Sequence, residues 1–157
     1  MTATGNGADG LELTLTRLID APREKVFKAW ITPEILMEWW CPKPWRVAEC
    51  ELVPRAGGVL RTLMRGPQGE SHDMVGVYLE IVPGQKIVFT DAFKPGWVPA
   101  KPFMVATVTF EDEGGKTRYT ARVLHWSADD RETHEKMGFH EGWGIAAQQL
   151  EDIARTL

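Results

Sequence analysis

Cysteine, basic charge and long hydrophobic runs are all scarce in this 157-residue sequence. Its two cysteines, Cys41 and Cys50, form no CxxC motif and no zinc-ligand set surrounds them, so we expect two free thiols; a disulfide or a reactive thiol is the alternative. The apolar runs fall far short of the roughly 18 residues of a transmembrane helix, and the first ten residues lack the segments of a secretory signal. We therefore expect no membrane association, a cytoplasmic location and a disordered tail at residues 1–10.

The shortage of basic residues also bears on nucleic-acid binding. The 18 Lys and Arg residues are outnumbered by 22 Asp and Glu, which gives a net charge of −4, and no basic run or basic face stands out. The electrostatic footprint of a nucleic-acid-binding protein is missing. With 43% hydrophobic and 25% charged residues the composition is globular. The length suits one ordinary domain, which we expect to span residues 11–157.

The hydrophobic pattern changes from strand to helix early in the chain. Residues 10–20 begin with a strict alternation of apolar and polar side chains, which is typical of a half-buried strand. Residues 20–31 and 32–40 then place apolar side chains at helical spacing, and Pro22 and Pro33 suit the first turn of a helix. The pattern predicts two short helices.

The middle of the chain predicts an antiparallel meander, because short alternating segments are separated by glycine-containing turns. The expected strands are residues 47–54, 59–65, 71–81, 86–92, 103–111 and 116–126. Residues 128–157 are predicted to form one long helix, because apolar residues from Phe139 to Leu157 recur at spacings of three and four. Gly138, Gly142 and Gly144 weaken its first half, and a bend or a close packing contact there would explain them.

This order of elements favours an antiparallel sheet with one face covered by helices. A curved sheet wrapped around one helix tends to leave a cavity between the two, and ligand sites favour such places. Large side chains filling that space are the alternative.

Five segments carry a resemblance to known proteins. They are RLIDAPREKVFKAWITPEILMEWW, VPRAGG, GVYLEIVPGQKIVFT, VTFEDEGGKTRYT and HEGWGIAAQQLEDIA, and together they span nearly the whole chain from Leu11. The sequence resembles the START-like (SRPBCC) helix-grip superfamily, which includes birch-pollen-allergen-like proteins and polyketide cyclases. Within it, the sequence is most similar to the family named for the activator of the 90-kDa heat-shock protein ATPase. The resemblance implies an α+β helix-grip fold: a strand, two short helices, a six-stranded antiparallel meander and a long C-terminal helix.

The resemblance also implies classes of function. Stand-alone relatives look like binders of small apolar ligands, and a few superfamily members act on polyketide-like compounds. Co-chaperones of the family carry a further N-terminal domain that engages the chaperone, and this chain has no room for one, so we do not expect chaperone contact. The leading hypothesis is binding of a small hydrophobic or aromatic ligand. A cyclase- or hydrolase-like enzyme and a protein-interaction module are the alternatives, and we expect no cofactor.

Ten large apolar or aromatic side chains are candidates to line the ligand cavity. They are Trp39, Trp40, Met74, Tyr78, Phe89, Trp97, Phe103, Trp126, Met137 and Trp143. Trp39 and Trp40 lie about 100° apart on a helix, so we expect one in the core and the other facing the ligand. Trp97 belongs to residues 92–104, whose three prolines and one glycine preclude regular strand. That loop is either a lid over the cavity or a patch on the core.

Catalysis would need convergent titratable groups, and the sequence offers few. His134 and His140 point about 120° apart on a helix and form no HExxH pair, so we expect no metal site. If the protein is an enzyme, the candidates are His125 at the end of the last strand, His72 and Glu51. The alternatives are a hydrogen-bonded strand-end histidine for His125 and solvent exposure for His72.

Two further expectations concern charge and assembly. Arg17 and Arg61 fall within predicted strands, and we expect them to face solvent or to be paired, because an unpaired buried charge is costly. Open sheet edges make a homodimer a reasonable expectation.

Overall fold

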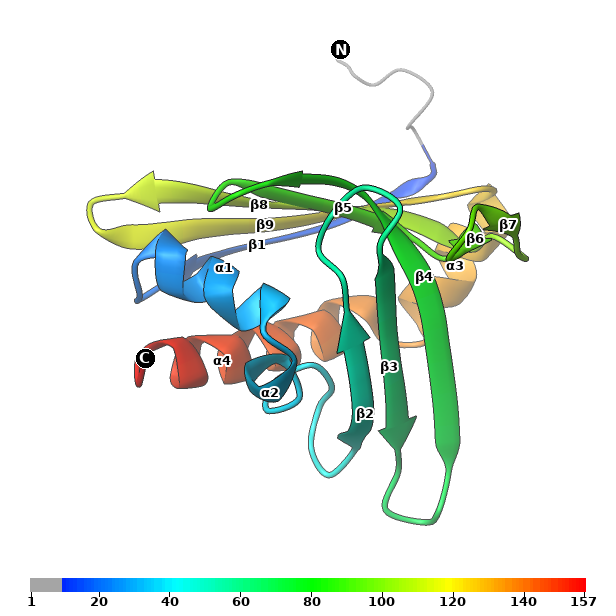
Figure 1. Cartoon of the computed structure of the whole chain (residues 1–157), viewed down its shortest axis with the longest axis horizontal. Coiled ribbons are helices and arrows are strands. Elements are labelled where there is room, and N and C mark those ends of the chain that lie inside the picture. Colours follow the sequence, from blue (N-terminus) through cyan, green and yellow to red (C-terminus); the bar gives the residue numbers. More distant parts are fainter. Residues whose placement is uncertain (1–9) are drawn as a thin grey trace.

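The computed structural model describes residues 10–157, so the predicted tail lies almost wholly outside the described residues. The elements run from a strand and two short helices through a series of strands to two C-terminal helices (Figure 1). They are β1 (Glu12–Ile19), α1 (Arg23–Ile31), α2 (Pro33–Leu36), β2 (Arg46–Leu52), β3 (Val59–Arg65), β4 (Ser71–Val82), β5 (Lys86–Thr90), β6 (Phe93–Lys94), β7 (Val98–Pro99), β8 (Met104–Glu113), β9 (Lys116–His125), α3 (Ala128–Lys136) and α4 (Phe139–Ala154).

Seven strands form one antiparallel sheet in the order β1-β9-β8-β5-β4-β3-β2. The predicted meander is confirmed, and each strand begins and ends within two residues of its predicted limit. The prediction that residues 92–104 contain no strand is wrong for four residues, because β6 and β7 pair there as a small hairpin. Helix α2 has only four residues, fewer than the pattern predicted.

The sheet curves around α4, and α1 lies on the same inner side (Figure 1). Alternate residues of β9, Tyr119 to His125, are all buried on this inner face, as the alternation predicted. The core also takes Trp30 from α1 and Phe139 from α4, which are nearly inaccessible to solvent. The indole Nε1 of Trp30 donates to the hydroxyl of Tyr119 at 3.2 Å, which satisfies a polar group in the apolar interior.

Polar contacts fix α4 against the rest of the molecule. Arg17 of β1 donates to the carbonyl of Gly144 and to the side-chain oxygen of Gln148, both at 2.8 Å, so it is paired as predicted. The amide of Gln149 donates to the carbonyls of Trp39 and Cys41 at 3.0 and 2.9 Å. Helix α4 is therefore held both to the β1 edge of the sheet and to the segment that follows α2.

The predicted long C-terminal helix is confirmed as α4, but it does not extend over residues 128–157, because the helix breaks between α3 and α4. Gly138 sits at the break with a φ of 93°, in the left-handed region that costs other residues free energy. Ser127 caps α3 by accepting from the backbone N–H of Asp130 at 3.0 Å. The glycine-rich sequence had suggested a bend, and the structure assigns that bend to Gly138.

Two alanine substitutions separate the break from the helix interior. A Cβ atom added at Gly138 or at Gly142 would meet no neighbouring atom within 4 Å, so only backbone conformation distinguishes the two positions. We expect Gly138→Ala to lower the free energy of unfolding by about 1–2 kcal/mol, and Gly142→Ala, inside α4, to raise it by about 0.5–1 kcal/mol. Chemical denaturation measures both. Equal stabilisation by the two variants would mean that α3 and α4 form one continuous helix.

Candidate functional site

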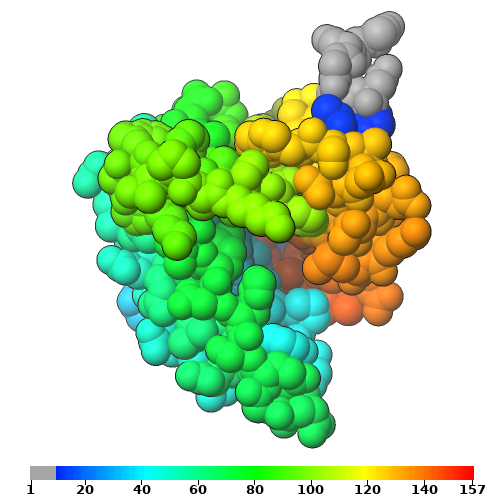
Figure 2. Space-filling model, turned by 90° about the vertical axis from the view of Figure 1, so that its right-hand side faces the viewer, coloured from blue at the N-terminus to red at the C-terminus, as the bar shows by residue number. Residues whose placement is uncertain are grey.

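The inner face of the sheet is covered unevenly. The β2–β3–β4 end hangs away from α4, and Figure 2 shows the molecule hollowed there, between the β3–β4 segment and the α3–α4 segment. At the opposite end of the sheet, inner-face residues such as Ala106, Val108 and Ala121 are fully buried. The hollow is therefore the place where the inner face is accessible.

Apolar side chains around this hollow are only half-buried. Cys50 and Leu52 of β2, Met74 of β4 and Met104 of β8 lie on the inner face and pack against the edge of the core. Trp40 and Trp143 add two indole rings. The first stacks edge-on against Trp30 at 5.2 Å and the second lies against Phe139 at 5.3 Å. These half-buried side chains make the partly exposed edge of the core apolar and partly aromatic.

Two buried hydroxyls on the inner face of the sheet have no hydrogen-bond partner among residues 10–157. They belong to Thr62 of β3 and Tyr78 of β4, and both residues are 0% exposed. Burial raises the pKa of the Tyr78 phenol, and the neighbouring Cys50 thiol contributes to the rise. Burial, with the nearby Glu34 carboxylate, raises the pKa of Cys50 to about 11. Both groups are therefore neutral at physiological pH, and Cys50 is no reactive thiolate.

A pair of histidines lies where β9 meets α3. His125 Nδ1 is 2.8 Å from the carbonyl of Leu11, so it carries the proton, and His125 Nε2 is 2.9 Å from His134 Nδ1. Phe103 packs against both imidazole rings at 5.5 and 5.2 Å. Burial, together with His125, lowers the pKa of His134 to about 4. His134 is therefore neutral at pH 7.

The predicted lining residues divide into three groups. Trp40, Met74, Phe103 and Trp143 are half-buried. Trp39, Tyr78 and Phe89 are core residues, and the indole N–H of Trp39 donates to the Ala29 carbonyl at 3.0 Å. Trp97, Trp126 and Met137 are 52%, 53% and 73% exposed, and the catalytic candidates His72 and Glu51 are exposed as well. The structure therefore does not bring His72 or Glu51 together with His125.

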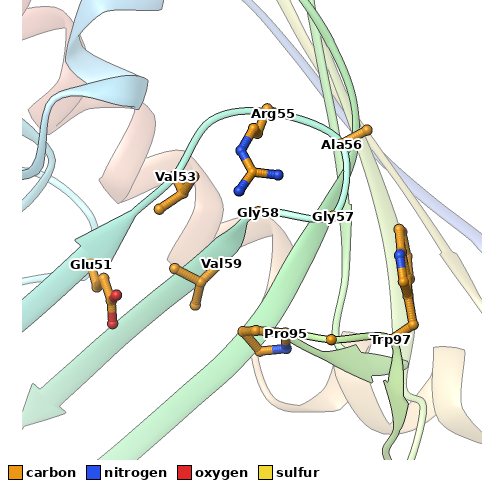
Figure 3. A pocket seen from close by; sticks show the side chains of 10 residues that line it. Glu51, Val53, Arg55, Ala56, Gly57, Gly58, Val59, Pro95 and Trp97 are labelled. Atoms are coloured by element: carbon orange, nitrogen blue, oxygen red, sulfur yellow. The ribbon is translucent and has the colours of Figure 1, made fainter.

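A separate pocket of about 440 Å³ lies between the β2–β3 turn and the β6–β7 hairpin (Figure 3). Its lining residues are Glu51, Val53, Arg55, Ala56, Gly57, Gly58, Val59, Pro95, Gly96 and Trp97. Glu51 and Val59 alternate with residues that face the core, so this pocket opens on the outer side of the sheet. Trp97 adopts a φ of 60° and packs over Gly57, whose added Cβ would lie 3.1 Å from the indole. Trp97 therefore belongs to this outer pocket.

Sequence reasoning missed Thr62, Cys50 and His134. A threonine between Leu60 and Met64 on one face of a strand was a visible signal for a polar group among apolar neighbours. His134 follows His125 by nine residues but on another element, so only the turn from β9 into α3 brings their rings together.

Neither a metal centre nor a membrane span is found within residues 10–157. No group of three or more His, Cys, Asp or Glu side chains there could hold a metal ion. No helix among these residues is both long and apolar enough to cross a bilayer.

The curved antiparallel sheet around a C-terminal helix, with short helices between its first two strands, defines the START-like helix-grip class of proteins. The chain belongs to the family described as Activator of Hsp90 ATPase homolog 1-like protein, whose family model matches residues 20–155.

Solved structures agree with this assignment. A protein of Nitrosomonas europaea is 35% identical, with a TM-score of 0.91 over 94% of this chain and 96% of that chain. A protein of Mycobacterium smegmatis, 24% identical over 97% and 95% of the two chains, has a TM-score of 0.79. An AHSA1-like protein of Aeromonas hydrophila, 14% identical over 93% of each chain, has a TM-score of 0.69. The last two show the fold alone. No curated protein matches the sequence.

The histidine pair makes stability depend on pH. The pKa of His134 is about 4 in the folded protein and 6.5 ordinarily. Between these two pH values His134 is therefore protonated in the unfolded chain but not in the folded protein. The free energy of unfolding should fall as pH drops from about 6.5 to about 4. His134→Gln should flatten this slope, whereas His72→Gln, at an exposed position, should leave it unchanged. Urea denaturation across that range measures the slope, and parallel curves for wild type and His134→Gln would contradict the prediction.

Proposed function

We propose that the protein binds a small hydrophobic or aromatic molecule in the hollow between α4 and the β2–β3–β4 end of the sheet. The observation that carries the proposal is that apolar inner-face side chains of β2 and β4, namely Cys50, Leu52 and Met74, stay half-buried, whereas inner-face residues of β8 and β9 such as Ala106 and Ala121 are fully buried. Apolar surface gains about 25 cal/mol per Å² when it leaves water. A ligand bound there would bury the apolar side chains that are only half-buried in the free protein.

The chemistry of the wall supports an apolar ligand of variable shape. Trp40 and Trp143 offer flat rings, against which aromatic or alicyclic groups pack well. Met74 and Met104 are unbranched and polarizable, so they adapt to ligands of different outline. The outer pocket beside Trp97 suits such a ligand less well, because Glu51 and Arg55 bring charged groups to its lining.

A second candidate function, a cyclase- or hydrolase-like enzyme, is favoured by the histidine pair alone. The carbonyl of Leu11 holds His125 in one tautomer, which would leave His134 Nε2 as a neutral base beside Phe103. Turnover of a polyketide-like compound that His134→Gln abolishes would establish it. The cytoplasmic location and a homodimer remain predictions from the sequence, and chaperone contact is not part of the proposal.

Binding of a neutral fluorescent probe tests the hollow against the outer pocket. N-phenyl-1-naphthylamine, whose emission rises in apolar surroundings, should bind the wild type. We expect Trp143→Ala to weaken its binding about tenfold, or about 1.4 kcal/mol, because it removes one ring from the wall. Trp97→Ala is the matched control and should change the affinity less than twofold.

Thermal melting of both variants checks that they are folded. If Trp97→Ala loses probe binding and Trp143→Ala does not, the binding site is the outer pocket and the hollow is excluded. If the wild type does not bind the probe at all, the proposal of a hydrophobic binding site is contradicted.

A further inference from the structure

We propose that the outer pocket beside Trp97 is a second binding site, which takes a small zwitterion: an amino acid or short peptide whose ammonium group pairs with Glu51, whose carboxylate pairs with Arg55, and whose apolar part packs on the indole of Trp97. This site is separate from the hollow and does not depend on the function proposed for the hollow.

The backbone of Trp97 is the first sign of a binding role. Its φ of 60° lies in the left-handed region, where a residue with a side chain is less stable than glycine. Burial does not compensate for this strain, because the side chain is 52% exposed. The indole is held by edge-on packing against Phe93, at 5.6 Å between ring centroids, and by its contact with Gly57. Strained residues of this kind cluster at ligand sites, and this one holds a flat aromatic surface at the edge of the pocket.

The β2–β3 turn forms a rigid wall of the same pocket. The N–H of Gly57 donates to the carbonyl of Tyr78 at 2.8 Å, and the N–H of Tyr78 donates to the carbonyl of Gly58 at 2.9 Å, so the turn is fixed to β4. A Cβ atom added at Gly58 would lie 1.9 Å from the carbonyl oxygen of Val53, so this close approach requires glycine. The pocket volume of about 440 Å³ falls within the range of roughly 300–1,000 Å³ that is typical of small-molecule sites.

Two side chains of opposite charge line the pocket and form no ion pair within residues 10–157. One is Glu51, which lies directly across from Arg61 in the β2–β3 register. The guanidinium of Arg61 pairs instead with Glu49 at 3.1 Å and with Asp73 at 3.0 Å. The carboxylate of Glu51 therefore has no cation beside it, and the guanidinium of Arg55, the second charged group, has no anion.

These groups together define the chemistry of the ligand. Figure 3 shows Glu51 and Trp97 on opposite sides of the pocket, with Arg55 between them at the top of the view. A molecule with a single charge would be attracted by one of the two charged residues and repelled by the other, whereas a zwitterion is attracted by both. Val59 and Pro95 extend the apolar surface of the indole, on which the side chain of an amino acid can pack.

An NMR titration tests the proposal, because ¹⁵N-labelled protein gives one indole N–H signal for each tryptophan. The probes are L-phenylalanine and glycyl-L-phenylalanine, two zwitterions whose charges lie at different separations. Each is compared with its amide, which lacks the carboxylate, and with its N-acetyl derivative, which lacks the ammonium group. We expect at least one zwitterion to shift the Trp97 signal and to bind about threefold to fivefold more tightly than either of its derivatives, as exposed ion pairs allow.

Variants that remove one charge assign each ion pair. Glu51→Gln should abolish the advantage of the zwitterion over its N-acetyl derivative, and Arg55→Gln should abolish its advantage over the amide. Glu111→Gln on β8 and Arg65→Gln at the far end of β3 are matched controls, because both residues are exposed and neither lines the pocket. We expect both controls to bind every probe as the wild type does.

A variant of the aromatic surface gives the second reading. Trp97→Ala identifies the Trp97 signal by its absence, and it should weaken binding of the zwitterion at least threefold. Trp126→Ala is the control, because Trp126 is 53% exposed against 52% for Trp97 and does not line the pocket. Its affinity for the zwitterion should be that of the wild type.

The contrary outcomes are distinct from a failure of the function proposed for the hollow. Equal binding of the zwitterions and their derivatives to the wild type, or equal effects of Glu51→Gln and Glu111→Gln, would overturn the second site. A zwitterion that shifts only the signals of Trp40 and Trp143 would bind in the hollow, which also overturns it. Absence of any shift at millimolar concentrations would overturn the second site alone, because the site in the hollow is measured with a neutral probe.

Discussion

The sheet of this protein is wider than the surface that its helices can cover, and the packing of the whole molecule depends on this difference. Seven strands about 4.8 Å apart span roughly 29 Å, whereas a helix covers a strip only about 10 Å wide. Helix α4 is bound to one edge, because Arg17 of β1 holds its Gly144 carbonyl. Helix α1 also packs beside β8, β9 and α4. The cover therefore gathers at the β1 end. On β2, β3 and β4 the burial is uneven, because Leu60, Thr62 and Tyr78 are fully buried whereas Cys50, Leu52 and Met74 are only half-buried.

Packing at the two ends of the inner face differs for the same reason. At the covered end, Trp30 and Tyr119 satisfy one another within a fully buried core. At the open end, Met74 and Trp143 keep part of their surface in contact with solvent. Stability is thus concentrated where the helices lie, and partly exposed apolar surface is concentrated where they do not.

Much of the fold could be predicted because its signals are local. Alternation and glycine turns predicted six strands of the meander to within two residues at each end. The break at Gly138 was harder to predict, because the polar segment before it also suits a solvent-exposed helix and only the backbone geometry reveals the left-handed residue. The site was harder still. Strand register alone places Cys50, Thr62 and Met74 side by side in a row. The turn into α3 alone brings His125 and His134 together. Neither arrangement can be predicted from the local sequence pattern.

The difference between fully buried and half-buried residues also affects which positions of such a protein can be substituted during evolution. Residues such as Leu60 and Phe89, which are 0% exposed, carry the free energy of folding, and replacing them opens cavities that cost several kcal/mol. Half-buried Met74, Met104 and Trp143 contribute less to folding while shaping the hollow. Substitutions there alter the outline of the cavity at a small loss of stability. This part of the surface can therefore vary between related sequences while the fold is retained.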